Sequence, residues 1–153
     1  MQQKPMTRKS EEALQNAQAS ARESGHPQLT AAHLAAALLA EPEGVTSAIL
    51  QKIDVDPKVV AAEMKQALSK LPRASGGELA ASRELQDTLV EANAAATKHG
   101  DDYVSTEHLL LALAKKGGPD VAGRLAARGA TPERIEAAFT EVRGSKKVTT
   151  PDP

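Results

Sequence analysis

The 153-residue chain carries 19 basic and 20 acidic side chains, and its formal net charge of −1 provides no positive field for a nucleic-acid backbone. One Phe, one Tyr and no Trp leave few aromatic rings to stack on bases. The absence of cysteine excludes a disulfide, a thiol nucleophile and a thiolate metal site. We therefore expect no nucleic-acid partner and no cysteine-dependent chemistry.

Apolar residues make up 41% of the chain, and most of them are alanine and leucine. Small side chains of this kind suit close helix–helix packing, so we predict an all-α fold. The first ten residues, MQQKPMTRKS, are polar, and no apolar run reaches the length of a signal peptide or a membrane span. We expect a cytoplasmic protein that has no membrane partner.

Two stretches of the sequence are copies of one unit. QLTAAHLAAAL at 28–38 aligns without a gap to YVSTEHLLLAL at 103–113. The same offset in numbering pairs residues along most of the chain: Arg8 with Arg83, Leu14 with Leu89, Gly25 with Gly100, His33 with His108, and Pro57 with Pro132. We predict two tandem repeats at 7–71 and 82–144, joined by a linker at 72–81.

Each repeat is predicted to contain four helices, taken here in chain order. The first carries an apolar stripe at helical spacing and ends near Gly25 or Gly100. The second begins at Thr30 or Ser105, both good N-caps. A short third helix and a fourth helix follow, and the fourth opens with an N-cap and a proline, as in Asp56-Pro57.

The apolar faces of these last helices are assigned from their spacing. The third carries Ile49, Leu50 and Ile53 in one repeat and Val121 and Leu125 in the other. The fourth carries Val60, Met64 and Leu68 in one repeat and Ile135, Phe139 and Val142 in the other. Four small helices leave apolar surface uncovered, so the two repeats are expected to pack together about a pseudo-twofold axis.

The familiar catalytic and ligand motifs are absent from the sequence. No G-x-x-x-x-G-K-[ST] occurs to hold a nucleotide phosphate, and no H-E-x-x-H occurs. No pair of the four histidines has the close helical spacing of metal ligands, so we predict no metal site and read His33 and His108 as structural residues. Without a nucleophile beside an acid or base, we predict that the chain is not an enzyme and has no cofactor of its own.

Three acids, Asp101, Asp102 and Glu107, precede and enter the second helix of repeat two. Glu107 in the first turn complements the helix dipole, and the two aspartates suit a turn, which is a purely structural interpretation. The equivalent position in repeat one is Ala32, so the helix forms without an acid there. A role for Glu107 in binding therefore stays open beside the structural interpretation.

The duplicated unit, with YVSTEHLLLAL and the turn GATPERI, resembles the Clp amino-terminal repeat domain of bacterial AAA+ unfoldases. The stretches LSKLPRASG and VRGSKKVTTPDP are similar to the ClpB-type disaggregase branch. The resemblance implies a Clp N-type domain at 1–144 and the start of a linker at 145–153 that leads to an absent AAA+ module. It also implies that ATP and Mg²⁺ are used only by such modules.

The resemblance implies that the chain recruits substrate for a disaggregase. It would bind exposed segments of unfolded or aggregated polypeptides and pass them to a homohexameric motor that works with an Hsp70-type chaperone system. Positions tied to substrate engagement in the family correspond to Thr7, Asp101 and Glu107, with Tyr103 in the same stretch. The apolar substrate groove of the family maps onto Glu91, Ala95 and His108, where this chain is more polar than relatives that carry leucines.

Two other functions remain open. ClpC-type relatives bind phosphorylated arginine through acids in both repeats, and a docking role for an adaptor or that mark is one alternative, although Ala32 speaks against it. A regulatory spacer that binds nothing is the other. A shallow apolar cleft with acids at its rim would favour segments that mix hydrophobic and basic residues.

Overall fold

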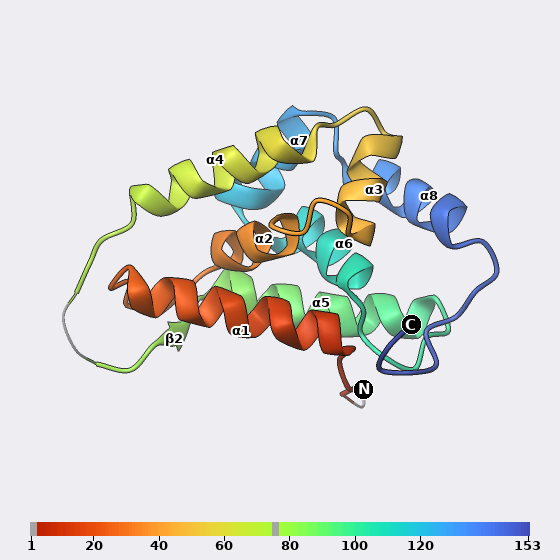
Figure 1. The fold of residues 1–153 in the computed structure, drawn as a ribbon, viewed down its shortest axis with the longest axis horizontal. Coiled ribbons are helices and arrows are strands. Elements are labelled where there is room, and N and C mark those ends of the chain that lie inside the picture. Colours follow the sequence, from red (N-terminus) through yellow and green to blue (C-terminus); the bar gives the residue numbers. More distant parts are fainter. Residues whose placement is uncertain (1–2, 75–76) are drawn as a thin grey trace.

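Eight α-helices make up most of the chain in the computed structural model, which describes residues 3–74 and 77–153 (Figure 1). The first repeat forms α1 (Arg8–Glu23), α2 (Ala31–Leu39), α3 (Val45–Lys52) and α4 (Pro57–Ser69). The second forms α5 (Arg83–Lys98), α6 (Thr106–Lys116), α7 (Arg124–Ala127) and α8 (Pro132–Arg143). Two short strands, β1 (Gln28–Leu29) and β2 (Ala80–Ala81), accompany them. The predicted all-α class is confirmed; Ser75 and Gly76 of the predicted linker lie outside the described residues.

Capping residues fix where the helices begin, at equivalent places in the two repeats. The Thr7 and Ser82 side chains accept backbone N–H bonds at the starts of α1 and α5. Asp56 and Thr131 do the same for α4 and α8, each followed by proline at the first helical position. The predicted starts of the fourth helices are therefore confirmed, and so are those of the second helices, whose N-caps are Thr30 and Ser105.

Glycine ends the first helix of each repeat, as the sequence predicted. Gly25 has φ 70° and Gly100 has φ 71°, in the left-handed region where a side chain is disfavoured. The turn before the fourth helix needs the same conformation at Asp54, with φ 61°, and at Gly129, with φ 86°. Repeat one therefore holds an aspartate where repeat two uses glycine.

The predicted third helix of repeat two is wrong in detail. A π-helical turn, η1 (Pro119–Gly123), comes first, and only the four-residue α7 follows it. Gly117 allows the close approach of this turn, because an added Cβ would lie 2.5 Å from the Leu113 carbonyl oxygen and 2.9 Å from the Val121 Cβ. Val121 and Leu125 are nevertheless buried, as the sequence indicated.

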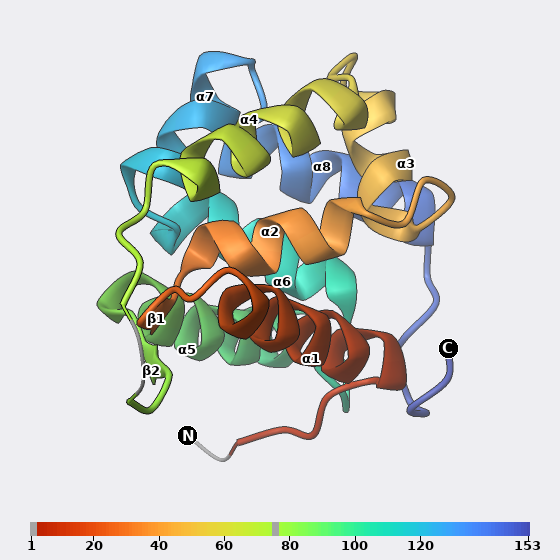
Figure 2. The same ribbon diagram turned by 60° about the vertical axis from the view of Figure 1, so that its left-hand side comes forward.

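The helices lie in three layers, each drawn from both repeats. Figures 1 and 2 show α1 and α5 on one side, α2 and α6 in the middle, and the remaining helices on the other side. Contacts cross between the repeats, because α3 packs on α8 and α4 packs on α7. The hydrophobic residues of α2 and α6 therefore face neighbours on both sides.

Short backbone pairings join the repeats reciprocally. Leu29 pairs with Ala81 in a parallel register, and Met6 pairs with Val104 in an isolated parallel bridge. Leu29 and Val104 are equivalent positions of the two repeats, and so are Met6 and Ala81. The residue that precedes the first helix of each repeat therefore pairs with the same position of the other repeat. A twofold relation between the repeats produces this reciprocal pattern.

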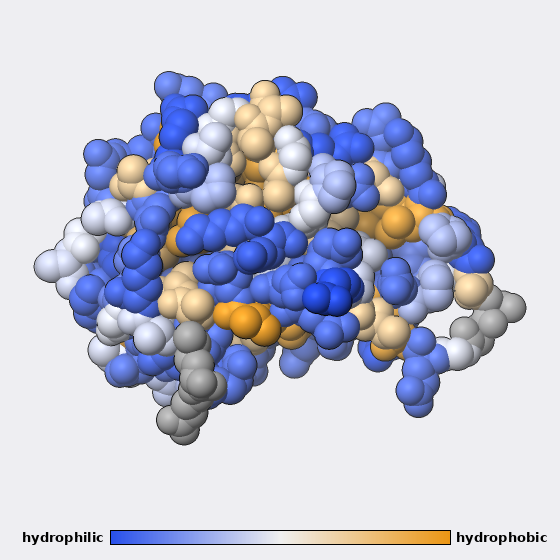
Figure 3. Space-filling model, turned by 180° about the vertical axis from the view of Figure 1, so that it is seen from behind, coloured by the Kyte–Doolittle hydropathy of each residue, from blue (hydrophilic) through white to orange (hydrophobic). Residues whose placement is uncertain are grey.

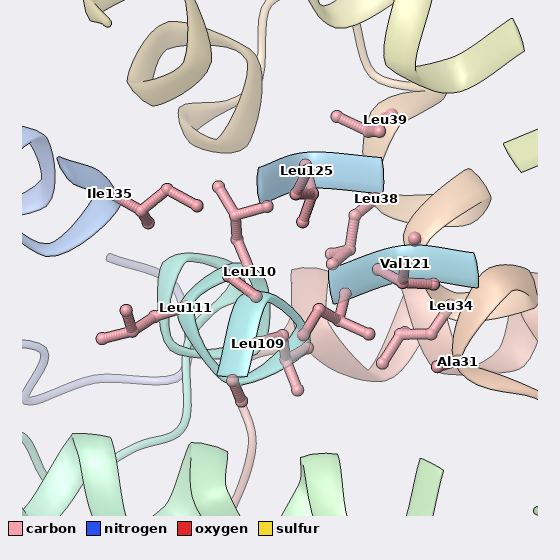
Figure 4. Close-up of a cluster of buried hydrophobic side chains, with 14 of the residues drawn as sticks. Ala31, Leu34, Leu38, Leu39, Leu109, Leu110, Leu111, Val121, Leu125 and Ile135 are labelled. Carbon is pink, nitrogen blue, oxygen red and sulfur yellow. The ribbon is translucent and has the colours of Figure 1, made fainter. Parts of the chain in front are cut away.

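The core is centred on leucines of the two middle helices (Figure 4). Leu34, Leu109, Leu111 and Leu113 are at most 1% exposed. The outer face seen in Figure 3 is mainly hydrophilic, with apolar side chains in small patches. Val142 departs from prediction, since it lies on the apolar stripe of α8 but is 43% exposed.

Candidate functional site

The seven residues assigned to substrate binding by sequence divide into two groups. Four have at most 4% of their surface exposed: Thr7, Ala95, Asp101 and His108. The other three, Glu91, Tyr103 and Glu107, are partly exposed. The buried four therefore offer almost no surface to a ligand.

The part of the predicted groove at Glu91, Ala95 and His108 lies on α5 and α6, which pack extensively against one another. Ala95 and His108 are buried there, and Glu91 forms an ion pair of 3.7 Å with Lys115 of α6. These positions therefore stabilise the contact between the helices.

His108 caps the N-terminus of α6 and takes part in a buried network of hydrogen bonds. The Ser105 backbone N–H donates to His108 Nδ1 at 2.8 Å, so this nitrogen is the unprotonated one. The Nε2–H then donates to Asp101 Oδ2 at 2.7 Å. Burial holds the pKa of His108 below its ordinary value although the Asp101 carboxylate opposes the effect. The imidazole is therefore neutral near pH 7.

Repeat one contains the same arrangement with a different partner. The Thr30 N–H donates to His33 Nδ1 at 3.0 Å, and His33 Nε2 lies 2.9 Å from His26 Nδ1. In the alignment of the repeats, His26 is the equivalent of Asp101. The predicted structural role of the two histidines at helix starts is consistent with these bonds, and both are fully buried.

Arg143 at the end of α8 connects the two acids of repeat two. Its Nη1 donates to Asp101 Oδ2, and its Nη2 donates to Glu107 Oε2 at 3.2 Å. Its guanidinium also lies 4.3 Å from the centre of the Phe139 ring. With 9% of its side chain exposed, Arg143 pairs with both carboxylates, and its single positive charge offsets one of their two negative charges.

The charge of Asp101 is stabilised by these contacts. Burial alone would raise the pKa of Asp101, but hydrogen bonds from Arg143 and from the Val148 backbone outweigh it, and the pKa lies below the ordinary value. Glu107 is also paired, with 13% of its side chain exposed. The charge of the expected acidic rim is therefore offset in part by Arg143.

Glu107 lies at the edge of a surface hollow with a volume of about 440 Å³. We call it the Glu107 hollow; its walls include Val45, Ile49, Glu107, Phe139, Val142 and Arg143. Val45 is 40% exposed and Val142 is 43% exposed, so apolar surface is open to solvent there. The hollow is shallow, apolar at its walls, and bordered by Lys146 and Lys147 as well as by Glu107.

Residues 145–153, the C-terminal segment, form the remaining wall. Val148 is 3% exposed, and its N–H donates to Asp101 Oδ1 at 2.9 Å. The Asp102 N–H donates to the Val148 carbonyl at 2.8 Å. Figure 1 shows this part of the chain turning back from α8 toward the rest of the domain.

No group of three or more His, Asp or Glu side chains that could hold a metal ion is present within residues 3–74 and 77–153. In the same part of the chain, no helix has the length and apolar character needed to cross a membrane.

Comparison with known families identifies the fold. The model of the Clp repeat (R) N-terminal domain matches residues 5–126. The chain belongs to this family. Chaperone protein ClpB of Mycobacterium tuberculosis (strain ATCC 25618 / H37Rv) is 40% identical over 149 residues, which is 96% of this chain and 18% of the relative. ClpB of Corynebacterium diphtheriae (strain ATCC 700971 / NCTC 13129 / Biotype gravis) is 43% identical over 150 residues, with the same coverage. The chain thus spans about a fifth of these relatives.

Solved structures show the same Clp N fold. The Hsp104 N-terminal domain from Candida albicans has a TM-score of 0.84 at 21% identity, with coverage of 96% of this chain and 97% of that one. A complex of the ClpV N-domain with a VipB peptide has a TM-score of 0.72 at 21% identity, with coverage of 90% and 86%. The resemblance inferred from the repeated sequence is therefore confirmed.

Sequence reasoning did not single out Arg143, the residue that links the two acids. Its counterpart in the alignment of the repeats is Leu68. Asp101 and Glu107 likewise replace His26 and Ala32. Three differences between otherwise similar repeats thus meet in one network, and a position-by-position comparison of the repeats would have found Arg143.

Proposed function

We propose that this chain is the substrate-recruiting N-terminal domain of a ClpB-type, ATP-dependent protein disaggregase in the cytoplasm. It binds exposed segments of unfolded or aggregated proteins and passes them to a hexameric motor whose ATPase modules are not in this chain. An Hsp70-type chaperone system acts with the full protein. The observation that carries the proposal is the identity of about 40% to ClpB over 96% of the chain.

A peptide complex of the related ClpV N-domain supports binding of polypeptide segments by this fold. In this chain we assign the contact to the Glu107 hollow, because it joins exposed Val45 and Val142 to a paired carboxylate. Apolar walls with a few polar groups are typical of a binding site. Glu107 and Arg143 then orient the segment at the edge while the valines contact its aliphatic side chains.

The affinity of one domain is expected to be weak. The hollow exposes little apolar surface, and ordering an extended segment costs conformational entropy, so we expect a dissociation constant in the micromolar range or weaker. Six domains on one hexamer would raise the effective affinity through multivalency. Weak individual contacts suit a protein that must release its substrate to the motor.

The proposal is tested by NMR titration of the labelled chain with α-casein, a soluble protein that is permanently unfolded. We expect shifts around Val45, Glu107 and Val142. Val142→Ser and Glu107→Ala should each weaken binding several-fold. Val90→Ser is the matched control, because Val90 is 70% exposed on α5 and does not line the hollow.

One outcome would reject this function, and another would reject only the assigned surface. If α-casein causes no shifts at millimolar concentration, the regulatory spacer explains the domain better. If binding is unaffected by Val142→Ser but lost with Val90→Ser, the segment binds on α5 and the assigned surface is wrong.

A further inference from the structure

The backbone of the C-terminal segment is held at Val148 as a bound peptide would be. Asp101 Oδ1 accepts the Val148 N–H, and the Asp102 N–H donates to the Val148 carbonyl, so both backbone groups of one residue are bonded to the domain. Every residue except proline carries these two groups. The contact can therefore be made by any extended segment that reaches the same place.

Side chains of the segment add selectivity to this backbone contact. Val148 is buried although it is not part of the central hydrophobic cluster of the described residues, so its side chain is shielded from water at a separate position, which we call the seat. Lys147 Nζ donates to the His99 carbonyl at 2.8 Å, at the C-terminal end of α5, where the helix dipole favours a cation. The seat thus suits a basic residue followed directly by a branched aliphatic residue.

A second anchor lies further along the segment. The Arg8 N–H donates to the Pro151 carbonyl at 2.9 Å, and the Arg8 side chain pairs with Asp152. The chain bends at Thr150 and Pro151, between the two anchors. The segment is therefore held at two points, and Val148, Thr149 and Thr150 form one wall of the Glu107 hollow.

We propose that residues 147–150 occupy a seat for extended client segments, and that a client with a basic residue followed by a branched aliphatic one displaces them. This inference rests on the proposed function and names both the seat and the class of segment. The C-terminal segment competes as part of the same chain, at an effective concentration in the millimolar range. Release of its two anchors would also free residues 145–153 from the domain.

The first test compares Val148→Ser with the natural chain and with the control Val90→Ser. Hydrogen exchange is measured at the Asp102 and Arg8 amides, whose acceptors lie in the C-terminal segment. Val148→Ser should speed exchange at both by about tenfold, because it removes the burial of one aliphatic side chain. Unchanged exchange would overturn the assignment of Val148 as the anchor.

The second test adds two synthetic peptides, SKKVTTPDP and SKKSTTPDP, to the full-length Val148→Ser chain. The first peptide should restore slow exchange at Asp102, whereas the second should bind at least about tenfold more weakly. Equal binding of the two peptides would contradict a selective aliphatic seat.

The third test measures α-casein binding to the same variants. Val148→Ser should bind α-casein several-fold more tightly than the natural chain, and SKKVTTPDP should compete with it. If α-casein binds all variants equally and the peptide does not compete, the inference fails while the proposed recruitment function stands. If α-casein binds none of them, both fail, even where the peptide still occupies the seat.

Discussion

His26 and Asp101 occupy equivalent positions in the two repeats, and each lies against Nε2 of the histidine that caps the following helix. In repeat one the partner is a second imidazole, whereas in repeat two the carboxylate also binds Arg143 and the C-terminal segment. Together with Arg143 in place of Leu68, this difference turns a helix cap into a junction of α6, α8 and the C-terminal segment.

Replacing Asp101 tests this junction directly. We expect Asp101→Asn to lower the free energy of unfolding by about 2 kcal/mol, because hydrogen bonds to a buried charged group are lost. Urea denaturation at pH 7 measures the change. His26→Asn, at the equivalent position of repeat one, is the matched control and should cost less, since no carboxylate bonded to Arg143 is removed. Equal losses would show that the charge of Asp101 contributes little.

The pH dependence of stability in acid should also depend on Asp101. Its pKa is lower in the folded state than its ordinary value of 3.8, so its contribution is fully present above that value. The contribution is lost as the pH falls through the folded-state pKa. Asp101→Asn should therefore flatten the decline in stability below about pH 4. An unchanged acid limb in urea titrations between pH 4 and pH 2 would contradict this.

His33 should affect stability in a different pH range. Burial, followed by the nearby charge of His26, lowers the pKa of His33 from 6.5 to about 4. Because the unfolded chain binds this proton more readily, stability should fall between pH 6.5 and pH 4, by about 3 kcal/mol for this residue. His33→Gln should reduce that slope, and the part that remains belongs to His108, whose pKa is also lowered. A natural chain whose unfolding free energy is constant over this range would refute the prediction.

Asp54 offers a stabilising substitution. Its φ of 61° is disfavoured for a residue with a side chain, and the equivalent Gly129 has φ 86°. We expect Asp54→Gly to raise the free energy of unfolding by about 0.5–1 kcal/mol, with part of the gain offset by the more flexible unfolded chain. Gly129→Ala is the reciprocal control and should destabilise, since its Cβ would lie 2.9 Å from Arg134 Nη1. The midpoint of the unfolding transition in urea measures the change in stability for both variants.

Phosphoarginine should not bind. Glu107 is already paired with Arg143, and its counterpart Ala32 has no carboxylate. We expect no saturable NMR shift with phosphoarginine at millimolar concentration, with inorganic phosphate as the control ligand. Saturable shifts around Glu107 that phosphate does not reproduce would favour the docking function of ClpC-type relatives.

Sequence by itself determined the repeat, the helix starts and the family. N-caps and prolines act within one turn of chain, as at Asp56 and Thr131, and helical spacing follows from local geometry, so both can be read without knowing the packing. The same local rules explain the left-handed glycines at 25 and 100. The linker boundaries and the substrate-binding roles stay predictions.

Only the tertiary structure decided which charged residues are buried and with which residues they pair. Asp101 reads locally as a turn residue, but Arg143 and Val148, which come much later in the chain, bury it and stabilise its charge. The helical spacing of α8 predicts that Val142 is buried. In the structure its side chain is 43% exposed and lines the Glu107 hollow. Burial and pairing depend on which segments that are distant in the chain come into contact. Local sequence patterns do not specify these contacts.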